Sequence, residues 1–184
     1  MMIMKRDMRK VIKKIILISF IIFILIYTIP FPINRQLDAV EIKIDDPSYL
    51  DKRKIHISGT YRFNLFADNT FRGQISVTEY ELTSEKMAEV EFVKSADNGG
   101  ILEYKYEIGT DESGRPLTKE YLFGRVFLNP RYRNIVIMLY EQYETEDGGY
   151  GGRFDSKSGY CIISSVDDRE GALKVLEIYG ILPH

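Results

Sequence analysis

The first 33 residues pair a basic segment with a dense apolar one. Residues 1–14 hold six lysines and arginines against a single aspartate, and residues 15–29 read IILISFIIFILIYTI, with one serine and one threonine as polar interruptions. At about 1.5 Å per residue the apolar run covers roughly 22 Å, and its apolar flanks extend it toward a hydrocarbon layer of roughly 30 Å. The pattern predicts a transmembrane anchor at 15–33 behind a basic cytoplasmic tail at 1–14.

A cleaved signal peptide is the alternative to an anchor, because secretory leaders also begin with a basic and an apolar region. The small residues of a cleavage site are missing after the apolar run, where residues 27–32 read YTIPFP, and no cysteine follows for lipid attachment. We therefore expect an uncleaved signal-anchor, with the lipid bilayer as the partner of residues 15–33. The basic flank predicts a cytoplasmic N-terminus and an extracytoplasmic domain at 34–184, held at the cell membrane.

Beyond residue 34 apolar and polar positions alternate, which is typical of strands buried on one face. The alternation is longest at 55–65, where the apolar side chains share one face, and it recurs at 71–77. Between these runs, residues 67–70 (ADNT) favour a turn. The two runs predict a long β-hairpin in an antiparallel sheet that is packed on one side.

Shorter segments predict further strands at 39–44, 90–92, 102–108, 121–128, 133–143 and 160–164. Turn-forming residues separate several of them, at 98–100 and 111–116, and the glycine-rich segment 148–152 predicts a flexible connection. The unbroken apolar run at 135–139 (IVIML) is the best candidate for a strand buried on both faces. This succession of strands predicts a barrel or a sandwich, and the pattern leaves both open.

The end of the chain has a helical period instead. Asp167 and Glu170 form a capping-box pattern, and Gly180 with Pro183 favours a helix end. The apolar side chains between them recur at helical spacing: Ala172, Leu173, Leu176 and Tyr179. We expect a short helix that covers an open sheet edge or a barrel end. The predicted fold class is mainly β: an N-terminal transmembrane helix, then an antiparallel β-barrel or sandwich with a short C-terminal α-helix.

Charge is distributed unevenly along the chain. The whole sequence has a formal net charge of −2, whereas residues 1–14 alone sum to +5, so that residues 15–184 carry −7. An acidic domain argues against nucleic acid as a partner, because phosphates are neutralised by clustered lysine and arginine.

Residues with metal-binding or nucleophilic chemistry are scarce. The two histidines are His56, on the polar face of a predicted strand, and His184 at the chain end, and Cys161 is the single cysteine. This set has no zinc-ligand spacing, and no base accompanies Cys161, which is expected to be a buried structural thiol. The sequence predicts no catalytic residue, no metal site and no cofactor.

Carboxylates are abundant, and two of them in one cleft can hydrolyse a glycosidic bond. The closely spaced pairs fall on predicted solvent faces: Glu79 and Glu81, Glu89 and Glu91, and Glu103 and Glu107. The sequence therefore favours a non-catalytic extracytoplasmic module that binds an extracytoplasmic partner protein, an envelope component or a small ligand. An envelope hydrolase with paired carboxylates is the alternative.

Two motifs carry a resemblance. The hairpin motif SGTY…LFAD…FRGQI at 58–75 and the helical motif DREGAL at 168–173 resemble those of small single-pass membrane-anchored β-domain proteins of Gram-positive bacteria. The resemblance implies a β domain that opens with this hairpin and closes with this helix, and it carries no activity and no functional residue. Gly59 and Tyr61 are also similar to the opening of lipocalin-type barrels, whose first-strand tryptophan is missing here.

Overall fold

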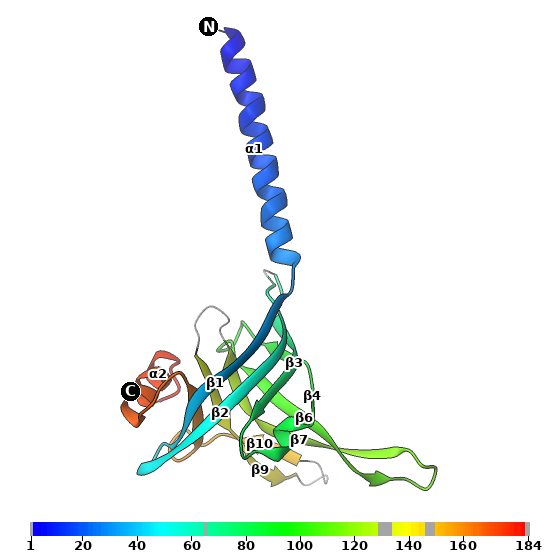
Figure 1. Ribbon diagram of the computed structural model, residues 1–184, viewed down its shortest axis with the longest axis vertical. Helices are drawn as coiled ribbons and strands as arrows, with labels where there is room; N and C mark the ends of the chain where they lie inside the picture. The colour runs from blue at the N-terminus through cyan, green and yellow to red at the C-terminus, as the bar shows by residue number, and fades with distance from the viewer. Residues whose placement is uncertain (1, 65, 129–133, 146–149, 183–184) are drawn as a thin grey trace.

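The computed structural model in Figure 1 describes residues 2–64, 66–128, 134–145 and 150–182, and in its first helix it describes the side chains of residues 11–24. That helix, α1 (Met2–Thr28), projects from a body that holds the remaining elements. Within the part of the chain that the structure describes, no helix is both long enough and apolar enough to cross a membrane. The helix ends before Pro30, because proline has no N–H to donate to a preceding turn.

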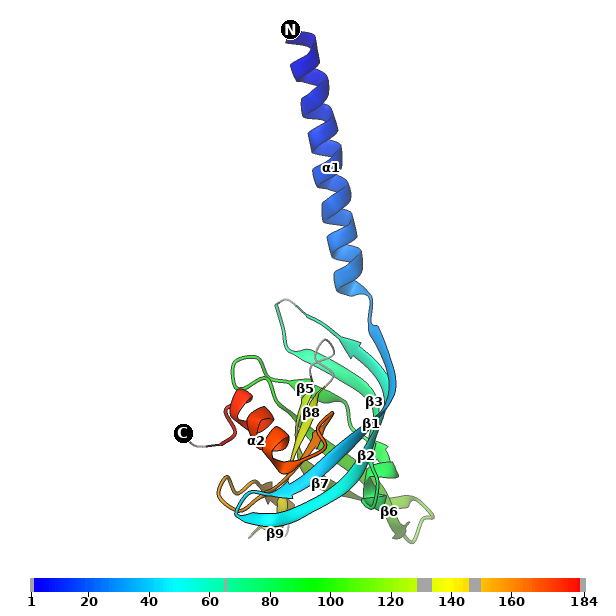
Figure 2. The ribbon, with the colours of Figure 1, turned by 60° about the vertical axis from the view of Figure 1, so that its left-hand side comes forward.

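The body is mainly β, as the sequence predicts. Among the described residues, nine strands form one antiparallel sheet in the order β4-β6-β7-β8-β11-β1-β2-β3-β5, curled into a half-barrel (Figure 2). The strands are β1 (Phe31–Lys43), β2 (Asp46–Arg62), β3 (Asn69–Val77), β4 (Lys86–Met87), β5 (Val90–Phe92), β6 (Gly100–Thr110), β7 (Pro116–Leu128), β8 (Ile135–Leu139) and β11 (Tyr160–Ser164). A separate pair joins β9 (Glu141–Glu144) to β10 (Tyr150–Arg153). A short 3₁₀ helix, η1 (Glu81–Ser84), follows β3.

The predicted hairpin at 55–77 is confirmed. Ile55 pairs with Val77 and Ile57 with Ile75, so the apolar positions of both strands fall on the same face. Further along, Gly59 pairs with Gly73, where the two backbones approach closely. A Cβ atom on Gly73 would lie 2.2 Å from the Ser58 carbonyl oxygen, which explains why glycine stands at this position.

One short segment contacts both edges of the sheet. β4 pairs with β6, and β5, two residues further along the chain, pairs with β3 at the opposite end of the strand order. The chain between them is too short to cross a flat sheet, so the sheet curls and brings its edges together. This curl encloses the main core on its concave side.

The main core is filled with side chains rather than open. Its largest fully buried members are Tyr104, Phe71, Phe92 and Phe123, packed among isoleucines, leucines and valines from the surrounding strands. The Tyr104 hydroxyl donates to the carbonyl oxygen of Ile75, which satisfies the one polar atom of the ring.

A second core lies on the convex face, under α2 (Arg169–Ile178). Val136, Cys161 and Ile163 contribute to it, whereas their neighbours Ile137 and Ile162 face the main core. The prediction of a strand buried on both faces at 135–139 is therefore confirmed for β8, and β11 shares this property. Expecting the C-terminal helix at an edge or a barrel end was wrong, because α2 packs over the central strands.

Three local predictions need correction. The N-cap of α2 is Asp168, whose carboxylate accepts from the Gly171 N–H over 2.7 Å, so the capping-box assignment to Asp167 was wrong. Residues 31–33, assigned to the anchor from the sequence, belong to β1, where Ile33 is buried. Part of the expected flexible connection is the strand β10. Several predicted positions lie outside the described residues: Leu65, residues 133, 148 and 149, Pro183 and His184.

Candidate functional site

The residues singled out from the sequence do not come together in the structure. His56 is exposed on β2, and Cys161 is fully buried in the convex-face core, where burial raises the pKa of its thiol to about 12. Within the described ranges, no three His, Cys, Asp or Glu side chains are arranged to hold a metal ion.

The paired glutamates of the hydrolase alternative lie on the surface, and several are bonded to basic side chains. Glu79 accepts from Arg53 and Glu89 from Arg72, while Glu103 lies 3.7 Å from Lys105. The carboxylates of these three glutamates thus take part in surface ion pairs.

A buried carboxylate that the sequence pattern did not reveal is Glu41. It follows Val40 and precedes Ile42, both of which face the second core, so strand alternation turns Glu41 to the opposite side. The alternation predicts the direction of this side chain correctly. It does not reveal that this side is also covered, which leaves Glu41 only 2% exposed.

Arg53 on β2 neutralises Glu41. Its Nε atom donates to Glu41 Oε2 over 2.7 Å, and its side chain is 9% exposed. The remaining guanidinium nitrogens donate to Glu79 (2.6 Å) and Asp51 (3.2 Å). One guanidinium therefore donates to three carboxylates. The cluster of Arg53, Glu41, Glu79 and Asp51 thus holds more acidic than basic groups.

Tyrosines surround this cluster. The Tyr49 hydroxyl donates to Glu41 Oε1 over 3.0 Å, and the Arg53 guanidinium lies 5.8 Å from the centre of the Tyr80 ring. Burial, with Glu41 adding to it, raises the pKa of Tyr49 and of Tyr80 well above the ordinary phenol value. Both hydroxyls are therefore neutral hydrogen-bond donors beside the carboxylate.

A cleft of about 340 Å³ opens beside the cluster. Five tyrosines line it, contributed by separate segments of the fold: Tyr49, Tyr80, Tyr121, Tyr140 and Tyr160. Phe123 and Leu139 complete the apolar part of the wall. Among the described residues that line the cleft, the charged ones are two glutamates, the buried Glu41 and the exposed Glu141.

The rings of the cleft contact one another. Tyr49 and Tyr160 pack edge to face with centroids 5.3 Å apart, and Tyr80 packs in the same way on Phe123 at 5.0 Å. These contacts and the Tyr49 hydrogen bond hold the ring orientations before any ligand arrives. We name this feature the tyrosine cleft.

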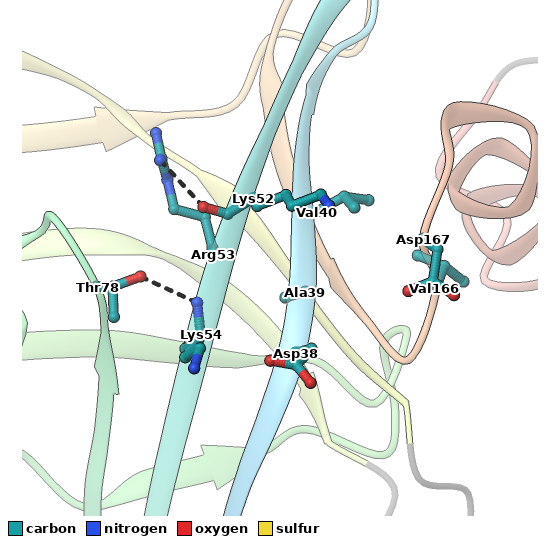
Figure 3. A pocket seen from close by; sticks show the side chains of 9 residues that line it. All are labelled: Asp38, Ala39, Val40, Lys52, Arg53, Lys54, Thr78, Val166 and Asp167. Carbon is teal, nitrogen blue, oxygen red and sulfur yellow. Dashed lines mark hydrogen bonds between the residues drawn. The ribbon is translucent and has the colours of Figure 1, made fainter.

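A second depression, of about 420 Å³, lies between the β1–β2 pair and the loop that leads into α2 (Figure 3). Its lining carries both signs of charge, with Lys52 and Lys54 on β2, Asp38 beside them on β1, and Asp167 in the loop before α2. It has no aromatic ring, and the guanidinium of Arg53 is engaged by carboxylates. The tyrosine cleft is therefore the better candidate site despite its smaller volume.

The chain was compared with known protein families, curated proteins and solved structures. No protein-family model, curated protein or solved structure matches the chain. The case for a function starts from the chemistry of the tyrosine cleft.

Proposed function

We propose that this chain is a membrane-anchored, extracytoplasmic binding module, without catalytic activity, whose tyrosine cleft receives a positively charged organic group such as an ammonium or a guanidinium. The observation that carries the proposal is the composition of the cleft: five tyrosines, with glutamates as the charged residues of its described lining. Aromatic faces and carboxylates together are the groups that attract organic cations.

The fold already places its own cations against two of these rings. Lys43 Nζ lies 5.7 Å from the centre of the Tyr160 ring, and the Arg53 guanidinium lies over Tyr80. Tyr121 and Tyr140 have no such contact described and line the same cleft beside Glu141. The charge of −7 on residues 15–184 would further raise the local concentration of cations.

The membrane anchor in this proposal rests on α1. The large apolar side chains at 11–24 are each 43–62% exposed, along a helix that stands away from the body (Figure 1). The apolar run continues to residue 29, and basic residues precede it. A hydrocarbon layer would cover these side chains, and the positive-inside tendency would leave the β domain outside the cytoplasm.

A titration of the full chain in lipid nanodiscs tests the cleft. The chain has thirteen tyrosines and no tryptophan, so its intrinsic fluorescence comes from tyrosine. We expect choline to change this emission saturably, whereas its uncharged isostere 3,3-dimethylbutan-1-ol does not. Spermidine and a lysine-containing peptide distinguish a free amine from a basic side chain of a partner protein.

Two variants locate the response. Tyr140→Ala removes an aromatic wall and should weaken choline binding by about 2-fold to 30-fold, the range expected for one cation–π contact. Glu141→Gln should also weaken choline binding, because it removes a negative charge from the cleft. Glu107→Gln is the matched control, because Glu107 is an exposed glutamate on β6 outside the cleft. Equal responses to choline and its uncharged isostere, or no response to any cation, would overturn the proposal.

A further inference from the structure

One end of the β domain carries exposed aromatic side chains close to the exit of α1. β1 begins at Phe31, which pairs with Tyr61 near the end of β2. The chain then turns back into β3 through residues 63–68, of which residue 65 is outside the description. Figures 1 and 2 both show this β2–β3 turn at the end of the domain from which α1 leaves.

The apolar side chains at this end are unusually open to solvent. Phe66 is 95% exposed, the highest value for a large hydrophobic residue in the described part of the chain. Phe63 and Phe31 are 48% and 53% exposed, and Ile29 is 64% exposed. Grouped apolar surface of this kind marks an interaction site, because a soluble surface normally keeps such residues apart.

Hydrogen bonds within the turn and from Lys94 of a neighbouring segment hold it in place. The backbone N–H of Asn64 donates to the Asn69 side chain over 2.9 Å, and that of Lys94 donates to Asp68 over 2.9 Å. The Lys94 ammonium donates to the carbonyl oxygens of Asn64 and Ala67. Hydrogen bonds therefore fix the turn that carries Phe66, and its ring projects from an ordered backbone.

Basic side chains stand behind the aromatic ones. Arg62 and Arg72 line a small cleft of about 250 Å³ together with Pro30, just past the end of α1, and Glu89, which accepts from Arg72. Lys94 Nζ lies 5.6 Å from the centre of the Phe63 ring. Aromatic rings with arginine and lysine just behind them match the depth profile of a membrane surface, with acyl chains first and phosphate groups next.

We propose that the β2–β3 turn docks on the outer leaflet of the membrane in which α1 is anchored, with Phe66 and Phe63 in the interfacial region and Arg62 at the level of the lipid phosphates. This inference rests on the proposed anchor. Because α1 already holds the domain at the bilayer, docking is intramolecular, and a few aromatic contacts suffice to fix the orientation.

Docking would direct the tyrosine cleft away from the membrane. Glu41 lies about ten residues of extended strand beyond Phe31, which is roughly 33 Å. The cleft would then face the extracytoplasmic space, open to its ligand.

Single-tryptophan reporters test the docking in the full chain, which has no natural tryptophan. Phe66→Trp places the reporter in the turn, and Ile108→Trp is the matched control, on the 58% exposed Ile108 of the β6–β7 hairpin. Phe20→Trp reports on α1 itself. Each variant is reconstituted in phosphatidylcholine–phosphatidylglycerol vesicles with and without brominated acyl chains, which quench tryptophan on contact.

We expect bromolipid to quench Phe20→Trp and Phe66→Trp strongly, with a blue-shifted emission for both, and to leave Ile108→Trp unchanged. Quenching of Phe20→Trp without quenching of Phe66→Trp would overturn the docking while the anchor stands. A blue shift of Phe66→Trp without quenching would mean that protein covers the turn, which also overturns it. Absence of quenching at Phe20→Trp would overturn the anchor and the docking together.

Discussion

Arg53 Nε donates a 2.7 Å hydrogen bond to Glu41 Oε2 across the β1–β2 pair, and the two side chains are only 9% and 2% exposed. An ion pair this deeply buried stabilises the fold only as long as both partners are present, because either charge alone would be stranded away from water. The same carboxylate accepts from Tyr49 and lines the tyrosine cleft, so the pair links the stability of the sheet to the shape of the candidate site.

Removal of Arg53 alone should therefore be costly. We expect Arg53→Met to lower the free energy of unfolding by about 3–5 kcal/mol, because it leaves the Glu41 carboxylate buried without its cation. The double variant Glu41→Gln with Arg53→Met should recover part of this loss, since no charge is then stranded. Urea denaturation of the full chain in detergent measures both, and a double variant no more stable than Arg53→Met would contradict the coupling.

The helix cap offers a comparison between adjacent aspartates. Asp168→Ala should cost about 0.5–2 kcal/mol, because the Asp168 carboxylate accepts from the Gly171 N–H at the start of α2. Asp167→Ala should have a much smaller effect, since Asp167 is exposed and does not cap the helix. Thermal denaturation followed by circular dichroism distinguishes the two, and equal losses would show that the cap is assigned to the wrong residue.

Buried thiol and phenol groups predict a loss of stability in alkali. The pKa of Cys161 rises from the ordinary value of 9.0 to about 12 on folding, and the pKa values of Tyr104 and Tyr80 are also raised by burial. Above about pH 9 the unfolded chain releases these protons before the folded chain does, so stability is full below that pH and falls as pH rises.

Urea denaturation at a series of pH values between about 8 and 11 measures this loss of stability. A single thiol contributes at most roughly 1.4 kcal/mol per pH unit to the loss. Cys161→Ala should be less stable near pH 8, because it leaves a cavity, but its stability should fall less steeply as pH rises, so that the two curves converge. Parallel curves for the two proteins would contradict a buried, protonated thiol. The native thiol should also resist maleimide until urea unfolds the chain.

Local periodicity was sufficient to predict much of the β domain. The alternation at 55–77 predicted a hairpin and its apolar face, because a strand turns successive side chains to opposite sides whatever packs against them. The continuous apolar run at 135–139 predicted a strand covered on both faces for the same reason. The short C-terminal helix followed from its spacing, although its cap moved by one residue, because capping depends on backbone angles that adjacent aspartates do not reveal.

The candidate site required long-range packing. Glu41 looks like any solvent-facing strand glutamate, and its burial arises only when β2 brings Arg53 beside it and the sheet curls around both. The five tyrosines of the cleft lie between residues 49 and 160, and no spacing in the chain connects them. The sequence by itself therefore determines where strands and helices form and which of their faces are apolar, because these features depend on residues that are near neighbours in the chain. Which faces are covered, and which distant groups meet, depends on strand order and curl, which are set by the packing of the whole domain.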